Sequence, residues 1–169
     1  MKAWQDLDAE VPGDNHKVVW DRFYAEFQFS PQFSPPHKPA IAEPDPSVTY
    51  KISQAFTGNA ETSQVLISDL SQKSLAAFQK CTATGQRLYA LDWQHQDYWF
   101  YPHGSHPEKW LIPVFPDGDY YIFLAEDFSF GTFGHPWEET ICVFGRPLLD
   151  AFAQDPPLLF HDIIRRVGV

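Results

Sequence analysis

Apolar residues recur along this chain with two periods, one typical of helices and one typical of strands. Over residues 14–28 the aromatic and aliphatic side chains return with a helical spacing, which predicts an amphipathic helix with a wide aromatic face. Similar spacing predicts a second helix over 69–81 and a third over 147–153, which begins with a proline in its first turn. Residues 157–166 are expected to form a short terminal helix or an irregular tail.

Strand patterns fill most of the remaining chain. Polar and apolar residues alternate over 48–52, and residues 64–68 fit either a strand or an early helical turn. Further strands are predicted at 87–94, 97–102, 110–115, 119–126 and 137–144. Links at His95-Gln96 and Asp117-Gly118 predict two hairpins, and a Gly-rich turn is expected at 131–136. Short links require antiparallel neighbours, so we predict an α+β fold with an antiparallel sheet of five or six strands and helices packed against it.

The length of 169 residues fits a single globular domain that spans 1–169. Its most unusual stretch is a Pro-rich loop at about 30–46, which holds six prolines and suits neither a helix nor an inner strand. We interpret this stretch as an extended loop that wraps the domain. A polyproline-type ligand for another domain is the alternative interpretation.

Charge and composition narrow the classes of partner. The formal net charge is −10, and 17% of the residues are aromatic. An acidic chain is poorly matched to nucleic acid or to an anionic membrane, whereas it favours encounter with a protein that has a basic face. The aromatic side chains are expected mainly in the core, with a concave binding surface as the second interpretation.

The start of the sequence does not predict export, because Met1–Asp8 lacks the apolar segment of a signal peptide. No apolar run approaches the roughly 20 residues that a membrane-spanning helix needs. The two cysteines, Cys81 and Cys142, are too few for a disulfide framework and are expected to be buried thiols. A cytoplasmic protein is therefore expected, and the sequence does not set its oligomeric state.

Three motifs carry a resemblance to a known family. They are Leu91-Asp92-Trp93-Gln94-His95, Pro116-Asp117-Gly118-Asp119-Tyr120-Tyr121 and Gly131-Thr132-Phe133-Gly134-His135-Pro136-Trp137-Glu138. Through them the chain resembles a bacterial family labelled as a domain of unknown function, a resemblance that implies a fold but no catalytic residues. The end of the last predicted strand, Phe144-Gly145, and the Leu-Leu-x-x-Phe that follows also resemble bacterial toxin-immunity domains in arrangement.

His135 is the leading candidate for chemistry, because it lies between a glycine and a proline in a segment expected to be a stiff turn. Glu138 follows three residues later, and a histidine beside a carboxylate can act as a general base with its orienting group. Asp119 is a further carboxylate for that orienting role. His135, Glu138 and Asp119 are therefore the candidate catalytic residues. The alternative is structural, with the imidazole binding backbone groups that a tight turn leaves unpaired.

The sequence has no phosphate-cradling loop, no dinucleotide-binding glycine pattern and no nucleophile elbow, so no cofactor is expected. His103-x-x-His106 has a spacing that metals use but lacks a third ligand at a diagnostic interval, so no metal is expected either. The leading hypothesis is a non-catalytic domain that binds another protein, as an accessory or immunity-like factor. The alternatives are a small hydrolase or transferase-like enzyme that uses His135, and a divalent-metal binder that uses His103, His106 and His135.

Overall fold

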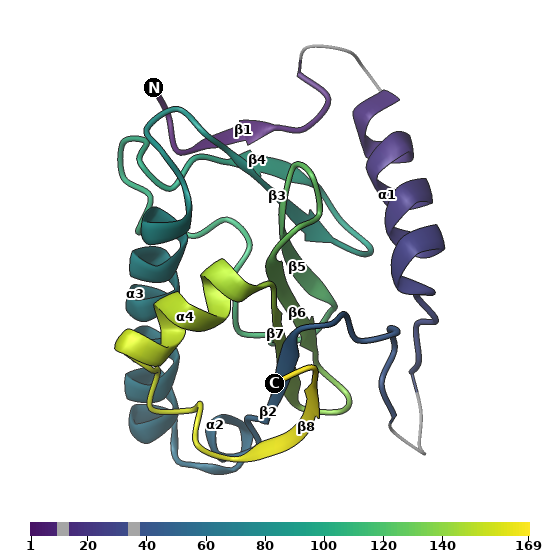
Figure 1. Ribbon diagram of the computed structural model, residues 1–169. Coiled ribbons are helices and arrows are strands. Elements are labelled where there is room, and N and C mark those ends of the chain that lie inside the picture. The colour runs from purple at the N-terminus through teal and green to yellow at the C-terminus, as the bar shows by residue number, and fades with distance from the viewer. Residues whose placement is uncertain (10–13, 34–37) are drawn as a thin grey trace.

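The computed structural model describes residues 1–9, 14–33 and 38–169, and within them one antiparallel sheet of eight strands forms the centre of the molecule (Figure 1). The strands are β1 (Trp4–Asp6), β2 (Ser47–Lys51), β3 (Leu88–Asp92), β4 (Tyr98–Phe100), β5 (Tyr121–Ala125), β6 (Gly131–His135), β7 (Thr140–Phe144) and β8 (Ile163–Val167). Their order across the sheet is β1-β4-β3-β5-β6-β7-β2-β8. The α+β class is confirmed, but the prediction of five or six strands is wrong.

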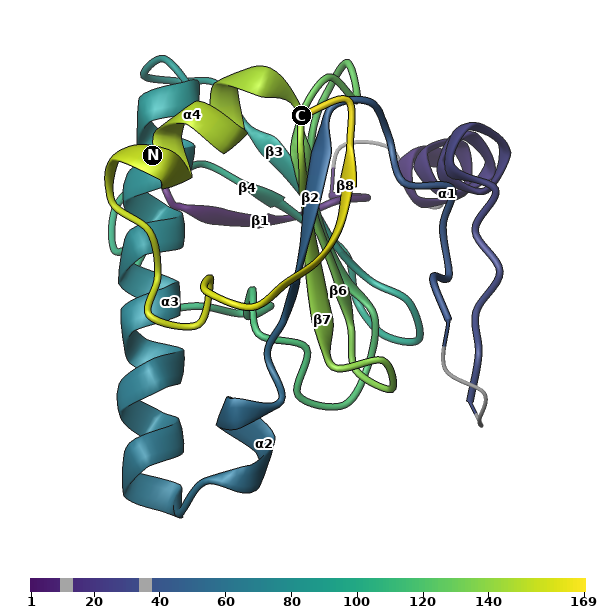
Figure 2. The same ribbon diagram turned by 60° about the horizontal axis from the view of Figure 1, so that its bottom comes forward.

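Helices cover both faces of this sheet. They are α1 (Asp14–Phe27), α2 (Gln54–Thr57), α3 (Ala60–Cys81) and α4 (Arg146–Gln154). Figure 2 shows α1 on one side of the sheet and α3 with α4 on the other. The helices predicted at 14–28 and 147–153 are confirmed. Among the described residues, none of the helices combines the length and the apolar character that crossing a bilayer requires.

Alternation along the strands gives each face of the sheet its own core. In β7, Ile141 and Val143 join the cluster that packs against α3 and α4, whereas Cys142 and Phe144 join the cluster that packs against α1. Burial on both faces explains why the central strands are apolar almost throughout. Cys142 is a buried free thiol as expected, while Cys81 is a free thiol that is only partly buried.

The helix predicted at 69–81 is longer than expected, because α3 begins at Ala60. Asn59 caps it, with its side-chain oxygen accepting a hydrogen bond from the Thr62 backbone N–H at 2.8 Å. The sequence Thr57-Gly58-Asn59 indicates a turn, but an asparagine that suits a turn also suits an N-cap. The ambiguous residues 64–68 therefore belong to the helix rather than to a strand.

The second predicted hairpin is wrong. Residues 110–115, all of which are described, form no strand. Ile112, Val114 and Phe115 are instead buried from an irregular segment in the core on the α3 side. Their apolar character reflects this burial, which periodicity alone does not distinguish from burial in a sheet.

The turn expected at 131–136 is also wrong, because residues 131–135 form β6 between β5 and β7. The two glycines there do not serve a turn. A Cβ atom at Gly131 would lie 2.1 Å from the Phe123 carbonyl oxygen, and one at Gly134 would lie 3.0 Å from the Pro116 ring. These glycines allow close packing of the backbone, which is the usual reason for glycine inside a strand.

Both edges of the sheet are strands that the sequence pattern does not predict. β1 has three residues, too few to show an alternation. β8 occupies the region expected to be a terminal helix or an irregular tail, and it pairs with β2. Arg165 and Arg166 therefore lie in a strand. The partner that makes β8 a strand is more than a hundred positions away, so no local pattern reveals it.

The Pro-rich loop connects α1 to β2. Pro35 and Pro36 fall outside the described residues, and within 30–33 and 38–46 the chain forms neither a helix nor a strand. Ala40 and Ile41 are buried in the core on the α1 side. The Tyr120 hydroxyl accepts a hydrogen bond from the Gln32 N–H at 2.8 Å and lies 3.2 Å from the Gln32 carbonyl oxygen. These contacts hold the loop against the sheet.

Candidate functional site

His135 ends β6 inside the protein, not on an exposed turn. The residue is 1% exposed, and its ring lies against the Tyr120 ring with centroids 4.9 Å apart. Nδ1 accepts a hydrogen bond from the Glu138 backbone N–H at 3.1 Å, so the proton of the neutral ring is on Nε2. Nε2 donates to the Lys38 carbonyl at 3.0 Å. Both ring nitrogens therefore hold backbone groups, an arrangement that favours the structural interpretation.

The Glu138 carboxylate binds Arg165 of β8. Two guanidinium nitrogens of Arg165 donate to the two carboxylate oxygens at 2.7 and 2.8 Å, and the Thr140 hydroxyl donates to Oε2 at 2.8 Å. Arg165 also donates to Glu43 through Nε at 2.9 Å, and Glu43 accepts from the Thr49 hydroxyl at 2.8 Å. Bidentate pairing of this kind is the strong form of a charge-assisted hydrogen bond.

The shifts in pKa favour the charged forms of Glu138 and Arg165 in this network. Burial raises the pKa of Glu138, but hydrogen bonds from Arg165 and Thr140 outweigh it, so that pKa lies below its ordinary value. Burial lowers the pKa of Arg165, yet Glu138 and Glu43 hold it above its ordinary value. The network ties β8 to the β6–β7 turn. Sequence reasoning missed Arg165 and Glu43, which are 122 positions apart and meet only because β8 pairs with β2.

Asp119 belongs to a different cluster, at the ends of β3 and β5. These strands pair so that Asp92 lies opposite Tyr121, which brings Asp119 beside the β3–β4 turn. His95 Nδ1 lies 2.9 Å from Asp92 Oδ1 and 3.6 Å from Asp119 Oδ2. The structure therefore brings His135 and Glu138 together, while it gives Asp119 other neighbours. The signal for this cluster is the Asp92-x-x-His95 spacing across a hairpin turn.

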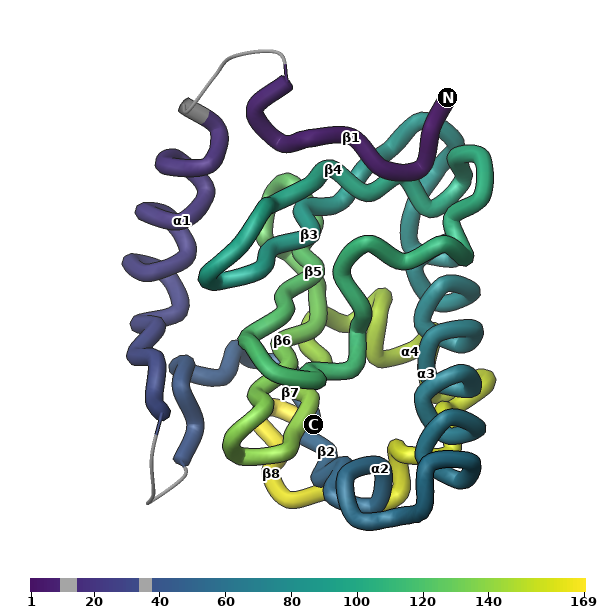
Figure 3. The backbone as a smooth tube through the Cα atoms, turned by 180° about the vertical axis from the view of Figure 1, so that it is seen from behind, coloured from purple at the N-terminus to yellow at the C-terminus, as the bar shows by residue number. Residues whose placement is uncertain are grey.

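A second buried aspartate holds the β3–β4 turn in place. Asp97 is 1% exposed, and its Oδ1 accepts from the Asp92 backbone N–H at 2.9 Å. Its Oδ2 accepts from the Trp20 indole N–H at 2.8 Å and contacts the His16 ring. Burial raises the pKa of Asp97 although these donors oppose the shift. The contacts attach the hairpin to α1, toward which it reaches in Figure 3.

The histidines of the metal hypothesis do not come together. The His103 ring contacts backbone carbonyls near the end of α3, and the His106 ring contacts a neighbouring glutamate at 3.3 Å. His135 is buried in the β6 network described above. Within the described part of the chain, one group of three or more acidic, imidazole or thiol side chains has ligand atoms that all lie within 4.8 Å of one another, and it consists of Asp92, His95 and Asp119.

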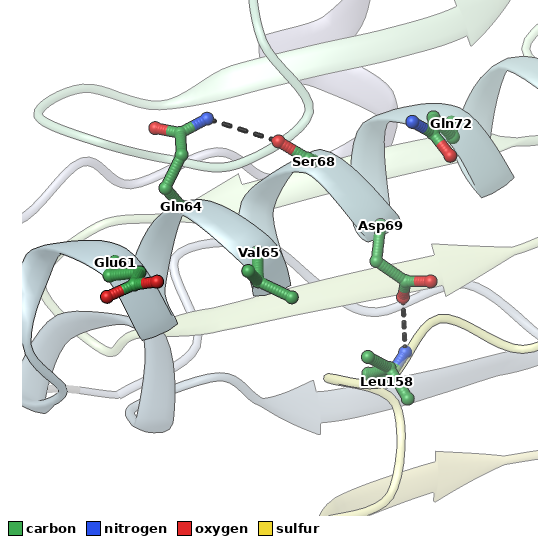
Figure 4. A pocket seen from close by; sticks show the side chains of 7 residues that line it. All are labelled: Glu61, Gln64, Val65, Ser68, Asp69, Gln72 and Leu158. Carbon is green, nitrogen blue, oxygen red and sulfur yellow. Dashed lines mark hydrogen bonds between the residues drawn. The ribbon is translucent and has the colours of Figure 1, made fainter.

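A groove of about 520 Å³ lies along the first half of α3 (Figure 4). Val65 from the helix and Leu158 from the segment after α4 line it, and they are 58% and 55% exposed. The Leu158 backbone N–H donates to the Asp69 carboxylate at 2.6 Å, which holds that segment beside the helix. Glu61 and Asp69 add carboxylates to the lining. The groove therefore combines exposed aliphatic side chains with acidic groups.

Comparison with known proteins identifies a family. The model of the family described as protein of unknown function, DUF2716, matches residues 10–149. The uncharacterized protein YxiI of Bacillus subtilis (strain 168) is 45% identical over 128 residues, which cover 72% of this chain and 79% of that protein. No solved structure matches the chain. The chain therefore belongs to the DUF2716 family, whose function is unknown, and the matched range includes the Asp92–His95–Asp119 cluster but not Arg165.

Proposed function

We propose that this chain acts as one cytoplasmic, non-catalytic domain that binds another protein, and that the partner places a basic, partly apolar segment in the α3 groove. The exposure of Val65 and Leu158 in one groove carries the proposal. Covering two exposed aliphatic side chains that line one groove removes apolar area from water, which is the main favourable contribution to most protein association. An accessory or immunity-like role is one form that such binding would take.

Charge supports a basic partner. The net charge is −10, so the molecule as a whole attracts cationic partners before contact. At the groove itself, Glu61 has no cationic partner among the described residues, whereas Asp69 is shared with Lys73 at 3.1 Å. A lysine or arginine beside the apolar anchor of the partner would therefore find a free carboxylate at Glu61. Complementary charge of this kind raises the rate of encounter and sets the orientation of docking.

The enzyme alternative remains a prediction, and the geometry gives it little support. The lone pair that a general base needs on His135 accepts a backbone N–H instead. The Glu138 carboxylate is engaged by Arg165, and Asp119 belongs to the cluster with Asp92 and His95.

Affinity capture with matched variants tests the proposal. Untagged protein is immobilised and exposed to a lysate of cells that express it naturally, as wild type, Val65→Lys and Val18→Lys. Val18 is 65% exposed on α1, on the other side of the sheet, so it controls for a new lysine on an exposed helix. A partner should be lost with Val65→Lys, be retained with Val18→Lys and be released by moderate salt.

Two outcomes of the capture experiment would overturn the proposal. One is that every captured protein survives Val65→Lys. The other is that both lysine variants lose the same proteins, which would indicate a general effect of charge. Unchanged melting temperatures must accompany the result, so that lost capture does not reflect unfolding. If the molecular mass in solution rises with protein concentration for the wild type but not for Leu158→Ala, the occupant of the groove is instead a second copy of the chain.

A further inference from the structure

The cluster of Asp92, His95 and Asp119 has the spacing of a small cation site. Its ligand atoms all lie within 4.8 Å of one another, and the two distances from His95 Nδ1 are 2.9 Å to Asp92 Oδ1 and 3.6 Å to Asp119 Oδ2. Around a tetrahedral Zn²⁺ with bonds of about 2.1 Å, ligand atoms stand roughly 3.4 Å apart. The three side chains therefore already lie close to the separation that one ion would impose.

An independent observation at Asp119 points to a ligand. The residue is 2% exposed, and its Oδ2 is a buried atom with no hydrogen-bond partner among the described residues. Its Oδ1 accepts from the Tyr120 backbone N–H at 2.7 Å. A buried carboxylate oxygen beside a second carboxylate is costly unless a cation compensates for it.

The backbone that carries the cluster is held from several directions. The Trp93 N–H donates to the Tyr120 carbonyl at 3.3 Å, which joins the start of the β3–β4 turn to the residue after Asp119. The Asp97 carboxylate accepts a hydrogen bond from the Asp92 backbone N–H, and it also accepts one from the Trp20 indole of α1. Contacts of this kind orient the groups that bind a metal without touching the ion. The His95 side chain is 68% exposed, so water can reach the cluster from that side.

We propose that Asp92, His95 and Asp119 bind one divalent transition-metal ion of the Zn²⁺ class. One imidazole with two carboxylates suits Zn²⁺ better than Mg²⁺ or Ca²⁺, which prefer oxygen ligands alone. The ion takes the lone pair of Nδ1, so the neutral ring carries its proton on Nε2, and the second proton of an imidazolium leaves to solvent. Water completes the coordination on the exposed side. This inference goes beyond the proposed function and uses no residue of the α3 groove.

Calorimetric titration of metal-stripped, untagged protein with ZnCl₂ near neutral pH tests the site. The wild type should bind one equivalent, and His95→Ala and Asp119→Asn should each weaken binding by at least about tenfold. His106→Ala is the matched control, because His106 is 69% exposed and likewise contacts a carboxylate. Absence of one-equivalent binding, full binding by both cluster variants, or an equal loss in His106→Ala would overturn the proposal. Tighter binding of MgCl₂ than of ZnCl₂ would overturn the assigned class of ion.

Thermal unfolding separates a ligand role of Asp119 from a merely structural one. In metal-free buffer, Asp119→Asn should melt at or above the wild-type temperature, because a neutral amide replaces a buried carboxylate whose Oδ2 accepts no hydrogen bond among the described residues. Added ZnCl₂ should raise the melting temperature of the wild type and leave that of Asp119→Asn unchanged. If the variant melts lower without metal and ZnCl₂ stabilises both proteins equally, the carboxylate is structural and the proposal fails.

Discussion

At the scale of residues, two buried carboxylates differ in how their charge is compensated. Glu138 receives hydrogen bonds on both oxygens, from Arg165 and Thr140. Asp119 has one buried oxygen without a donor among the described residues. A fully bonded ionic group stabilises one arrangement of its neighbours, whereas an uncompensated one favours proton uptake or cation binding. We therefore assign a structural role to the Glu138 carboxylate and place the Asp119 carboxylate in the proposed metal site.

Acid is predicted to destabilise the protein through Glu138. Its pKa is lower in the folded protein than the ordinary value of 4.5, so its contribution to the free energy of unfolding is full above the ordinary value. That contribution is lost as the pH falls through the lower folded value. Urea unfolding of the wild type and Glu138→Gln across this acidic range should show a weaker pH dependence in the variant. Identical slopes would contradict the assignment.

Replacement of Glu138 by glutamine should also be costly at neutral pH. Arg165 would lose its bidentate partner inside the protein, and breaking a buried pair in this way costs roughly 3–5 kcal/mol. Because Arg165 keeps Glu43 and its side chain is 28% exposed, a cost at or below the lower end of that range is expected. Comparison of the unfolding free energies of Glu138→Gln and Glu108→Gln, an exposed control, measures the difference. Equal stabilities would mean that the Arg165 network does not hold β8.

The sequence identifies some of these residues but not the distant partners that they meet. His135 and Glu138 stand out because they share an unusual motif, and the structure joins them through a backbone hydrogen bond. The third member, Arg165, cannot be predicted, since β2 brings it into place from the other end of the chain. Asp92 and Asp119 meet for the same kind of reason, through the register of β3 and β5.

At the scale of elements, β6 depends on glycine for space. A Cβ atom at Gly131 would lie 2.1 Å from the Phe123 carbonyl oxygen and 2.8 Å from the Phe144 ring. Gly131→Ala is therefore predicted to destabilise the protein by about 2–3 kcal/mol, the range of severe overpacking. At Gly118 no described atom lies within 4 Å of the added carbon, so Gly118→Ala should change stability little. Equal melting temperatures for the two variants would refute the packing argument.

The beginning of α3 depends on its cap. Asn59 accepts the Thr62 N–H, so Asn59→Ala should cost about 1 kcal/mol of unfolding free energy. Asn59→Ser keeps a side-chain oxygen that can accept at the N-cap and should recover most of that loss. Chemical denaturation of the three proteins checks both expectations. If the serine and alanine variants lose stability equally, the cap does not stabilise the helix.

Elements that bury a single apolar face were predictable from the sequence. Elements that depend on pairing or packing with distant residues were not. The aromatic stripe of α1 shows a helical period because only one side of that helix meets the sheet. The sequence of β6 resembles a turn because it contains two glycines. These glycines are required by close contacts with residues that are distant in sequence, which the local pattern does not reveal. β8 shows no clear alternation, since it lies at an edge with Ile163 and Ile164 both partly exposed.

At the scale of the whole molecule, the net charge of −10 acts in two opposite ways. Like charges repel in the compact state, so moderate salt should raise the melting temperature at neutral pH by screening them. The same screening should weaken capture of a basic partner. Melting curves and capture at low and moderate salt test the pair of effects together. A melting temperature that falls with salt would contradict the expected dominance of repulsion.

Docking of a partner in the α3 groove can be tested by site-directed photo-crosslinking in living cells. A photoreactive residue replaces Val65 or Leu158 in the groove, or Val18 on the far side of the sheet as a control. Docking in the groove predicts a discrete crosslinked protein from both groove positions and none from Val18. Crosslinks of the same protein from all three positions, or from Val18 alone, would contradict docking in the groove.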